Sequence, residues 1–185
     1  GTHAAYQASF KQAGVIEVDS IAELFDVALA FDFQPLPHGK RTVILTNAGG
    51  PAALASDSLA ANGLTLNDLE EKTRQTLRQK LNPSAQVGNP VDMLGAAEPA
   101  DYEFVIRTLL EDSNVDIILP ILVPQALVDT QAVGQAIVDS SKGSKKTVLS
   151  CIMGDMSVKE ARLVLHENKV PMYTYPEAMG TVLSA

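Results

Sequence analysis

The residues best suited to binding chemistry lie in the segment Thr42–Asp57, TVILTNAGGPAALASD. Val43–Leu45 is a short β-branched and apolar run, typical of a strand that is buried on both faces. Gly49 and Gly50 allow a tight turn, and Pro51 suits the start of a helix, where its missing N–H would have had no partner. The segment therefore predicts a strand, a glycine turn and a helix whose free N–H groups and dipole could stabilise a phosphate or a carboxylate.

The same pattern has a purely structural interpretation. Every βα unit needs such a turn, and the residues alone favour binding and a plain turn about equally. Neither a Walker lysine nor the G-x-G-x-x-G spacing follows the glycines, so the segment is neither a P-loop nor a dinucleotide-binding fingerprint. Direct nucleotide binding by this loop is therefore disfavoured.

A second polar segment, Asn89–Asp92, places an amide and a carboxylate around a proline-stiffened turn. Such a pair could orient a ligand or another chain. The alternative is an Asx turn, in which the side chains bond their own backbone, and the residue types alone favour it. The segment becomes a candidate binding segment because it would lie beside other loops at the carboxyl ends of the strands.

Hydrophobic runs predict the strands that would position these segments. After the first strand, further strands are predicted at Leu64–Leu66, Asp116–Val123, Thr147–Met153 and Met172–Tyr175. Helical patterns alternate with them at residues 51–62, 70–81, 102–111, 131–140, 158–167 and 176–183. This alternation predicts an α/β fold, a flavodoxin-like doubly wound parallel five-stranded sheet in the order 2-1-3-4-5. Pro120 lacks a ladder donor and predicts a bulge or an irregular pairing.

Open parallel sheets bind ligands beyond the carboxyl ends of their strands, where the strand order reverses. Four loops are predicted to meet there: Asn47–Pro51, Gly88–Leu94, Pro124–Leu127 and Gly154–Met156.

The first 34 residues are predicted to form an appendage to this sheet. Residues 1–34 would hold a helix–strand–helix extension and a linker, ahead of a domain at residues 35–185. The predicted parts are a helix at Ala4–Ala13, a strand at Val15–Val18, a helix at Ile21–Ala30 opened by the capping box Ser20–Glu23, and a proline- and glycine-containing linker at Gln34–Gly39.

Composition limits the classes of partner. The 185 residues are 46% hydrophobic, typical of a globular chain long enough to bury about 70% of its unfolded surface. A net charge of −8 makes nucleic acid and anionic membranes unexpected partners. No apolar run approaches the roughly 20 residues of a membrane span, and no signal peptide is evident, so a cytoplasmic location is expected.

The chain begins without Met and ends at Ala185 within a helical pattern, so we expect it to be a piece of a larger protein.

Thiol and metal chemistry are not expected. Cys151 lies in the apolar run Thr147–Met153, which favours a buried strand thiol over a nucleophile. The three histidines, His3, His38 and His166, have no neighbours at metal-ligand spacing, so no metal site is expected.

Four motifs, taken in order, carry a resemblance to a known family. They are Ala5–Ile16, Thr46–Pro51, Asn89–Asp92 and Ile121–Pro124, and the resemblance covers essentially the whole chain. Their joint order and spacing resemble the ADP-forming acyl-CoA synthetases (acetate–CoA ligases, ADP-forming), which are related to succinyl-CoA synthetase. The resemblance implies that residues 35–185 are a succinyl-CoA-synthetase-like flavodoxin domain, the second flavodoxin-like domain of a modular ligase.

The resemblance also implies a reaction, cofactors and partners. The parent enzyme would interconvert acyl-CoA, ADP and phosphate with a carboxylic acid, CoA and ATP, through an acyl phosphate and a phosphohistidine. A CoA-binding Rossmann domain would precede this chain and an ATP-grasp domain would lie elsewhere in the enzyme. Those domains would bind most of the CoA, ATP or ADP, and Mg, and the parent is expected to form a homo-oligomer that acts on a small acyl substrate.

The phosphorylated histidine that the resemblance implies is not in this chain. The family's Ser-His-Thr-Gly motif would lie a few residues before Gly1, and His3 stands where the family usually has Asp. No catalytic residue is therefore assigned here, and the chain alone is expected to be inactive. Its implied role is to present a helix N-terminus to the phosphohistidine. In succinyl-CoA synthetase two helices flank the phosphohistidine in this way, and this chain would supply one of them.

The resemblance and the glycine loop together give a set of candidate site residues. The phosphoryl group would lie against the backbone amides of Ala48, Gly49, Gly50 and Ala52, with Asn47 beside them. The rim of the site, or a contact with a neighbouring domain, would be formed by Asn89, Pro90, Asp92, Pro124 and Gly154.

Two alternatives to the ligase remain open. Bacterial protein lysine acetyltransferases carry a similar synthetase-like region as a regulatory module, although that region often lacks the glycines retained here at Gly49 and Gly50. The third possibility is a non-catalytic domain that only bridges subunits.

Overall fold

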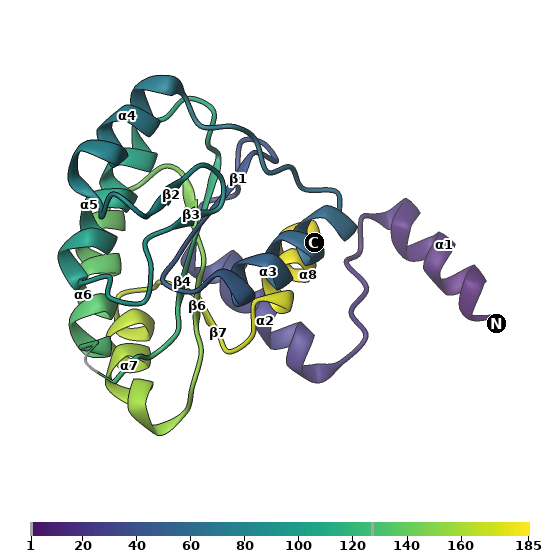
Figure 1. The fold of residues 1–185 in the computed structure, drawn as a ribbon. Helices are drawn as coiled ribbons and strands as arrows, with labels where there is room; N and C mark the ends of the chain where they lie inside the picture. The colour runs from purple at the N-terminus through teal and green to yellow at the C-terminus, as the bar shows by residue number, and fades with distance from the viewer. Residues whose placement is uncertain (1, 127) are drawn as a thin grey trace.

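The centre of the computed structural model is a mostly parallel sheet of seven strands, within the described residues 2–126 and 128–185 (Figure 1). The strand order is β2-β3-β1-β4-β6-β7, and β5 pairs with β4. The strands are β1 (Thr42–Thr46), β2 (Gln86–Val87), β3 (Val91–Asp92), β4 (Ile117–Leu122), β5 (Thr147–Val148), β6 (Ser150–Ile152) and β7 (Met172–Tyr173). The β2–β3 pair is antiparallel and the other pairs of these strands are parallel.

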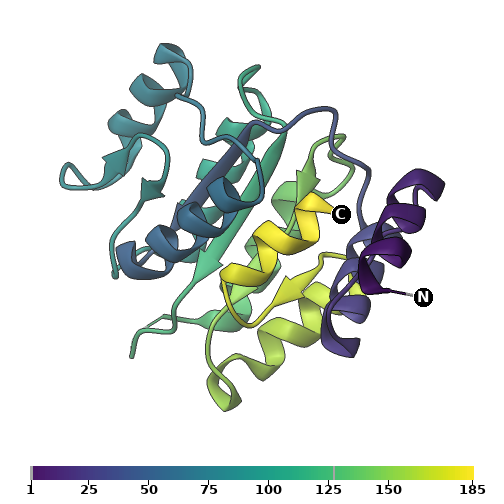
Figure 2. The same cartoon turned by 90° about the vertical axis from the view of Figure 1, so that its right-hand side faces the viewer.

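Helices cover both faces of the sheet (Figure 1). One face carries α4 (Glu71–Lys80), α5 (Pro99–Leu110), α6 (Thr130–Ser141) and α7 (Lys159–Glu167), the last preceded by the short η1 (Met156–Val158). The other face carries α2 (Ile21–Phe33), α3 (Gly49–Ala61) and α8 (Glu177–Ser184). Figure 2 shows α3 and α8 side by side, and Gly180 permits this approach because a Cβ there would collide with Ser58.

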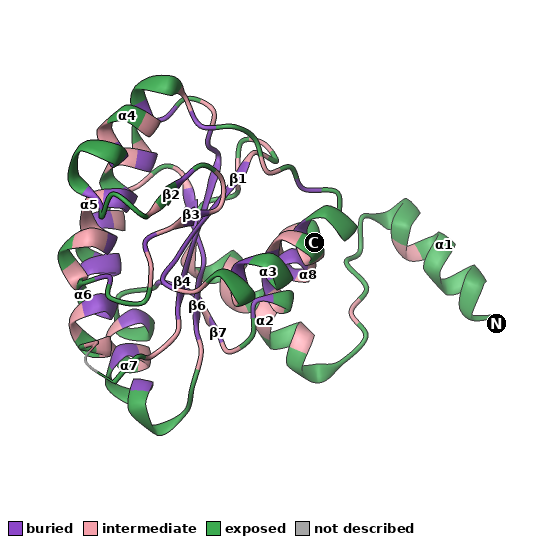
Figure 3. Ribbon diagram, viewed as in Figure 1, coloured by how far each residue is buried: buried purple, intermediate pink, exposed green. Residues whose placement is uncertain are grey.

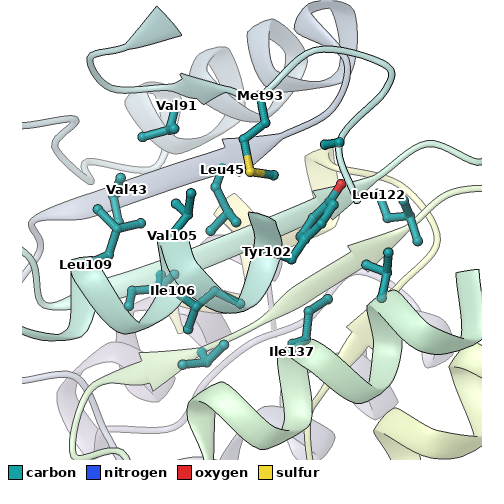
Figure 4. Packing of buried hydrophobic residues seen from close by; sticks show 14 of the residues in the cluster. Val43, Leu45, Val91, Met93, Tyr102, Val105, Ile106, Leu109, Leu122 and Ile137 are labelled. Carbon is teal, nitrogen blue, oxygen red and sulfur yellow. The ribbon is translucent and has the colours of Figure 1, made fainter. Parts of the chain in front are cut away.

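The strands separate two hydrophobic cores. Val43 and Leu45 of β1 join the core beneath α4–α7, which Figure 4 shows with Val105 and Leu109 of α5, whereas Ile44 joins the core beneath α3 and α8. All five positions of β1 are buried, and Figure 3 shows the sheet as the most buried layer. Burying each large apolar side chain contributes about 1.5–3 kcal/mol, so the sheet is a stable base for the loops at its ends.

The α/β class and the mostly parallel sheet predicted from the sequence are confirmed, but the strand list is corrected. Leu64–Leu66 is not a strand, and only an isolated bridge joins Arg41 to Thr65. The place beside β1 belongs to the two-residue β3, whose Val91 and Asp92 pair with Leu45 and Thr46. Seven strands therefore replace the predicted five, one of them antiparallel, and the predicted order is not reproduced strand for strand.

The irregular pairing predicted at Pro120 is present. β4 pairs regularly with β1, where Pro120 lies opposite Leu45. On its other side the predicted strand Thr147–Met153 is divided into β5 and β6. Proline has no N–H to donate across this ladder, which accounts for the break.

The N-terminal extension contains two helices without the predicted strand between them. α1 (His3–Ala13) buries no residue and extends away from the sheet (Figure 1). Val15 and Ile16 are 50% and 41% exposed and lie in an unpaired stretch, so the predicted strand at Val15–Val18 is wrong for the described chain. α2 packs instead on the body, where the Tyr173 hydroxyl donates to the Asp26 carbonyl over 3.1 Å.

The predicted cap of α2 is confirmed in part. The Ser20 hydroxyl accepts the Glu23 N–H, while the Glu23 carboxylate accepts the N–H of Asp19 and not that of Ser20. None of the helices in residues 2–126 and 128–185 is long and apolar enough to cross a membrane.

Candidate functional site

The glycine loop forms the predicted open helix N-terminus directly after β1. Ala48 is the N-cap residue of α3, has an extended backbone and provides no side-chain cap. The Ala48 N–H donates to the Thr46 hydroxyl over 3.0 Å, and Ala52 is the fourth helical residue, whose N–H points back to the Ala48 carbonyl in a regular helix. Pro51 has no N–H, so Gly49 and Gly50 provide the amides available to an anion.

The two glycines differ in what surrounds them. A Cβ on Gly50 would meet no described atom within 4 Å, so its side of the loop is open. A Cβ on Gly49 would lie 3.3 Å from Oδ2 of Asp92. The open N-terminus is therefore bordered by a carboxylate on one side only.

Asn47 has a structural role that the sequence did not predict. Its side chain is 2% exposed, donates from Nδ2 to the Val123 carbonyl over 2.8 Å, and accepts the Val123 N–H at Oδ1 over 2.9 Å. Both ends of the amide are thus used to fasten the glycine loop to the carboxyl end of β4. Asn47 positions the loop through these two hydrogen bonds.

Asp92 and Pro90 lie beside Gly49 at the border of the open N-terminus. The Oδ1 atom of Asp92 accepts the Leu94 N–H over 2.9 Å, which is the Asx turn that the sequence favoured. The other carboxylate oxygen of Asp92, Oδ2, faces Gly49. A cleft of about 480 Å³ runs along this border and is lined by Gly49, Ala52, Ala53, Ser56, Asp57, Gln86, Pro90 and Asp92.

Asn89 does not join this group. Its Oδ1 accepts the Ile44 N–H over 3.2 Å, and its Nδ2 donates to the Thr42 carbonyl over 2.7 Å and to the Asn67 carbonyl over 3.0 Å. Its amide therefore serves the backbone of β1 where β3 is too short to reach. That position is nearer the amino end of β1, away from the glycine loop.

Pro124 and Gly154 contact each other at the carboxyl ends of β4 and β6. Gly154 has φ +109°, and a Cβ there would lie 3.1 Å from Cγ of Pro124, so the position requires glycine. The Gly154 carbonyl accepts a hydrogen bond from Arg162 over 2.7 Å. The structure thus places the loops predicted at Pro124–Leu127 and Gly154–Met156 in contact. Leu127 lies outside the described residues.

Two buried groups, Cys151 of β6 and Tyr102 of α5, support the sheet and are unreactive. Cys151 is buried, which confirms the predicted strand thiol, and burial raises the pKa of that thiol to about 12. Burial, followed by the charge of Asp92, raises the pKa of Tyr102, whose hydroxyl donates to the Ile121 carbonyl over 3.0 Å. In the part of the chain that the structure describes, no three His, Cys, Asp or Glu residues are grouped to hold a metal ion.

Sequence reasoning missed one large feature at this edge. A cleft of about 610 Å³ lies between the loops that follow β3 and β4. Its lining residues are Gly95, Ala96, Ala97, Glu98, Pro99, Gln125, Ala126, Val128 and Asp129. The signal in the sequence was the run of small residues Gly95–Ala97 ahead of a helix that starts with proline.

Comparison with known proteins gives a consistent result. The model of the Ligase-CoA domain family matches residues 42–185. The alpha subunit of acetate–CoA ligase (ADP-forming) II from Pyrococcus furiosus is 39% identical over 100% of this chain, which spans 41% of that subunit.

Solved structures are similar over the same length. A crystal structure from Pyrococcus horikoshii OT3 has a TM-score of 0.94 and 39% identity, with 100% of this chain and 43% of that chain covered. The dinucleotide forming acetyl-coenzyme A synthetase 1 of Ca. Korarchaeum cryptofilum, in complex with phosphate and ADP, has a TM-score of 0.93 and 30% identity, with 100% and 40% covered. The chain thus spans about two fifths of these relatives.

Proposed function

Because this chain belongs to the Ligase-CoA domain family of the ADP-forming acetyl-CoA synthetases, we propose that it is the part of an acid–CoA ligase that stabilises a transferred phosphoryl group. The observation that supports this most directly is the uncapped N-terminus of α3, with Gly49 and Gly50 at its opening. The parent enzyme interconverts acyl-CoA, ADP and phosphate with a carboxylic acid, CoA and ATP.

The chemistry assigned to this chain is electrostatic. The phosphoryl group is carried by a histidine outside the chain and lies against the Gly49 and Gly50 amides, whose dipoles stabilise its negative charge. Asn47 holds the loop to β4, and Asp92 and Pro90 shape the cleft beside it. No residue of this chain exchanges a proton or forms a covalent bond in this role, so His3 has no part in it.

The family supplies the wider setting of the proposal. Residues 1–34 form the extension and linker, and residues 35–185 form the flavodoxin-like domain. A CoA-binding domain and an ATP-grasp domain of the same enzyme hold most of the CoA, the nucleotide and its Mg, and the assembled enzyme is a homo-oligomer. The relative from Ca. Korarchaeum cryptofilum, described with phosphate and ADP, supports the nucleotide and phosphate parts of this assignment.

Charge explains why the group would arrive attached to protein. A helix N-terminus attracts an anion by about 0.3–1 kcal/mol at an exposed site and up to about 2 kcal/mol when partly buried. The net charge of −8 and the nearby Asp92 oppose a freely diffusing anion. Delivery on a histidine raises the local concentration of the phosphoryl group and offsets this weak intrinsic attraction.

The test is Gly50→Val in the full-length enzyme. A Cβ on Gly50 meets no described atom within 4 Å, so the valine should fill the ligand space and leave the fold intact. Phosphorylation of the histidine by acetyl-CoA and phosphate should fall at least tenfold, which corresponds to about 1.4 kcal/mol in the transition state.

The matched control is Gly88→Val. Gly88 is exposed, and a Cβ there also meets no described atom within 4 Å, but it does not line the cleft. Unchanged phosphorylation in Gly50→Val would refute the proposal. Acetylation of an added protein without any ATP formation by the parent would instead support the regulatory module of an acetyltransferase.

A further inference from the structure

Helix α2 carries an apolar stripe on the side that faces solvent. The stripe consists of Ile21, Leu24, Phe25, Ala28 and Phe31, whose spacing of i, i+3, i+4, i+7 and i+10 places them on one side of the helix. Ile21 and Phe25 are 74% and 68% exposed, and the other members are exposed as well. The described residues of the chain therefore leave this side of α2 uncovered.

The opposite side of α2 packs against the body of this chain. Val27 is buried in the core beneath α3 and α8, and Ala30 packs against that core. The ring centroid of Phe33 lies 5.4 Å from that of His166 on α7. A surface helix is typically apolar on one side only, whereas a helix that is apolar all round is buried. The composition of α2 thus fits a helix held between two bodies, of which this chain supplies one.

The charges around the α2 stripe have one sign. Asp32 comes seven residues after Phe25 and therefore lies at the end of the stripe. Residues 12–39 include no Lys or Arg, and their carboxylates are Glu17, Asp19, Glu23, Asp26 and Asp32. Two copies of this chain placed stripe to stripe would bring these carboxylates together without a cation, which disfavours pairing of the chain with itself. A surface with its own Lys and Arg would be attracted by the same charges.

We propose that the α2 stripe is the docking surface for another domain of the same enzyme, one that presents apolar side chains bordered by Lys and Arg. This inference rests on the proposed function, in which the phosphorylated histidine lies outside this chain and has to be held against it. This chain spans 41% of the Pyrococcus furiosus subunit, so that relative contains further chain that could form such a domain.

The position of the α2 stripe suits this task. α2 and α3 lie on the same face of the sheet and share one hydrophobic core (Figure 1). A domain held by the stripe is therefore on the side of the sheet that carries the open N-terminus of α3. The apolar side chains supply the affinity of such a contact, and the charges around them fix its orientation.

Cysteine alkylation in the full-length enzyme tests whether the stripe is covered. Ala28→Cys places a thiol on the stripe, and its reaction with N-ethylmaleimide is followed by mass spectrometry of the peptide, which separates it from every other cysteine. The matched control is Ala22→Cys, which is exposed on the same helix but off the stripe. Position 28 should react at least about tenfold more slowly than position 22, because the docked domain has to open first.

A smaller difference between the two rates would overturn the proposal, because both alanines are exposed in this chain. Oxidation of the Ala28→Cys enzyme distinguishes the partner. A dimer linked by a disulfide between two copies of position 28 would identify a second copy of this chain on the stripe, and would overturn the proposal as well.

A charge reversal tests the chemistry of the partner. Adding Asp32→Lys to the Ala28→Cys enzyme should speed alkylation of position 28 at least about threefold, because the new cation repels a basic border. The control is Asp139→Lys, which reverses an exposed aspartate of α6 on the opposite face of the sheet and should leave the rate unchanged. Equal rates in the two charge variants would overturn the basic border.

Histidine phosphorylation of the wild-type enzyme tests the proposed function separately. If the histidine is phosphorylated while positions 28 and 22 react equally fast, the docking surface is refuted and the proposed function stands. If position 28 is protected while the histidine is never phosphorylated, the proposed function fails and the contact of α2 with another domain remains.

Discussion

The helix N-termini at the carboxyl edge of the sheet are of two kinds. At α5 the Asp101 carboxylate accepts the Glu98 N–H over 2.9 Å, and at α6 the Asp129 carboxylate accepts the Ala132 N–H. At α3 no side chain does so, and Gly49 and Gly50 open the helix. The N-termini of α5 and α6 are thus capped by the protein's own carboxylates, while that of α3, like those of η1 and α8, has no side-chain cap. The difference indicates that α3 was left open at some cost in stability.

The largest expected effect comes from releasing the loop that carries the open N-terminus. Asn47→Ala would leave the N–H and the carbonyl of Val123 without their partners in a partly buried place. We expect a loss of about 3 kcal/mol in unfolding free energy and a melting temperature lower by about 10 °C. Thermal unfolding followed by circular dichroism measures this, and a change below about 1 °C would show that Asn47 does not fasten the loop.

Adding a side-chain cap to α3, like that of Asp129 at α6, tests the comparison directly. Ala48→Asp places a carboxylate where it can accept the Gly50 N–H. Unfolding free energy should rise by about 1 kcal/mol, while histidine phosphorylation in the full-length enzyme falls about tenfold, because the new charge replaces and repels the phosphoryl group. Urea unfolding and a phosphorylation assay test the two halves.

Ala48→Gly is the control for that variant, since glycine changes the backbone without adding an acceptor. A gain in stability without a loss of phosphorylation in Ala48→Asp would mean that the α3 N-terminus is not where the phosphoryl group lies.

Removing the side-chain cap of α6, so that it resembles α3, is the reciprocal change. Asp129→Ala removes the acceptor of the Ala132 N–H, so unfolding free energy should fall by about 1 kcal/mol. Asp129→Asn should restore most of it. Equal stability of the alanine and asparagine variants in urea would contradict the capping role.

The opposite edge of the sheet supplies a paired carboxylate for comparison. Asp116, at the amino end of β4, binds the Arg41 guanidinium through both carboxylate oxygens, at 2.6 and 2.8 Å. The hydrogen bond from Arg41 holds the pKa of Asp116 below its ordinary value of 3.8. The folded carboxyl thus has the lower pKa, so its stabilising contribution is present above about pH 4 and is lost as pH falls toward the folded pKa.

Asp116→Asn should therefore reduce stability at pH 7 and matter less at pH 3. The expected effect is the smallest of this series, because the Arg41 side chain is 41% exposed and solvent screens the pair. Urea midpoints of both proteins at the two pH values measure it. A difference that is equal at pH 7 and pH 3 would exclude this linkage.

Local chemistry made the α3 loop predictable, whereas pairing made the strands harder to predict. Two glycines and a proline directly after an apolar run are typical of a turn into a helix, so Gly49–Pro51 could be identified from sequence alone. β3 has only two residues and no hydrophobic period, while Leu64–Leu66 has an apolar pattern but only a single bridge. The number of backbone hydrogen-bond partners determines which of the two segments forms a strand beside β1, and this number cannot be read from the sequence.

The roles of the candidate side chains were equally hidden. Asn47 was predicted beside the phosphoryl group, and Asn89 at the rim or a domain contact. Instead, Asn47 uses its amide on Val123, directly after β4, and Asn89 uses its amide on the backbone of β1. Asp92 lies beside Gly49 because it is the last residue of β3, which pairs with β1. The large cleft was missed since its walls come from loops about 30 residues apart in sequence.

The contacts of Asn89 also bear on how this chain avoids aggregation. β3 covers only the last two residues of β1, so without Asn89 the Thr42 carbonyl and the Ile44 N–H would lack these partners along the edge. An unsatisfied edge is a template for strands of other molecules, and the amide of Asn89 occupies it as a strand would. Removing that amide in Asn89→Ala should favour intermolecular β-structure during refolding, detectable by light scattering. A scattering trace identical to that of the original chain would show that the edge is protected by other means.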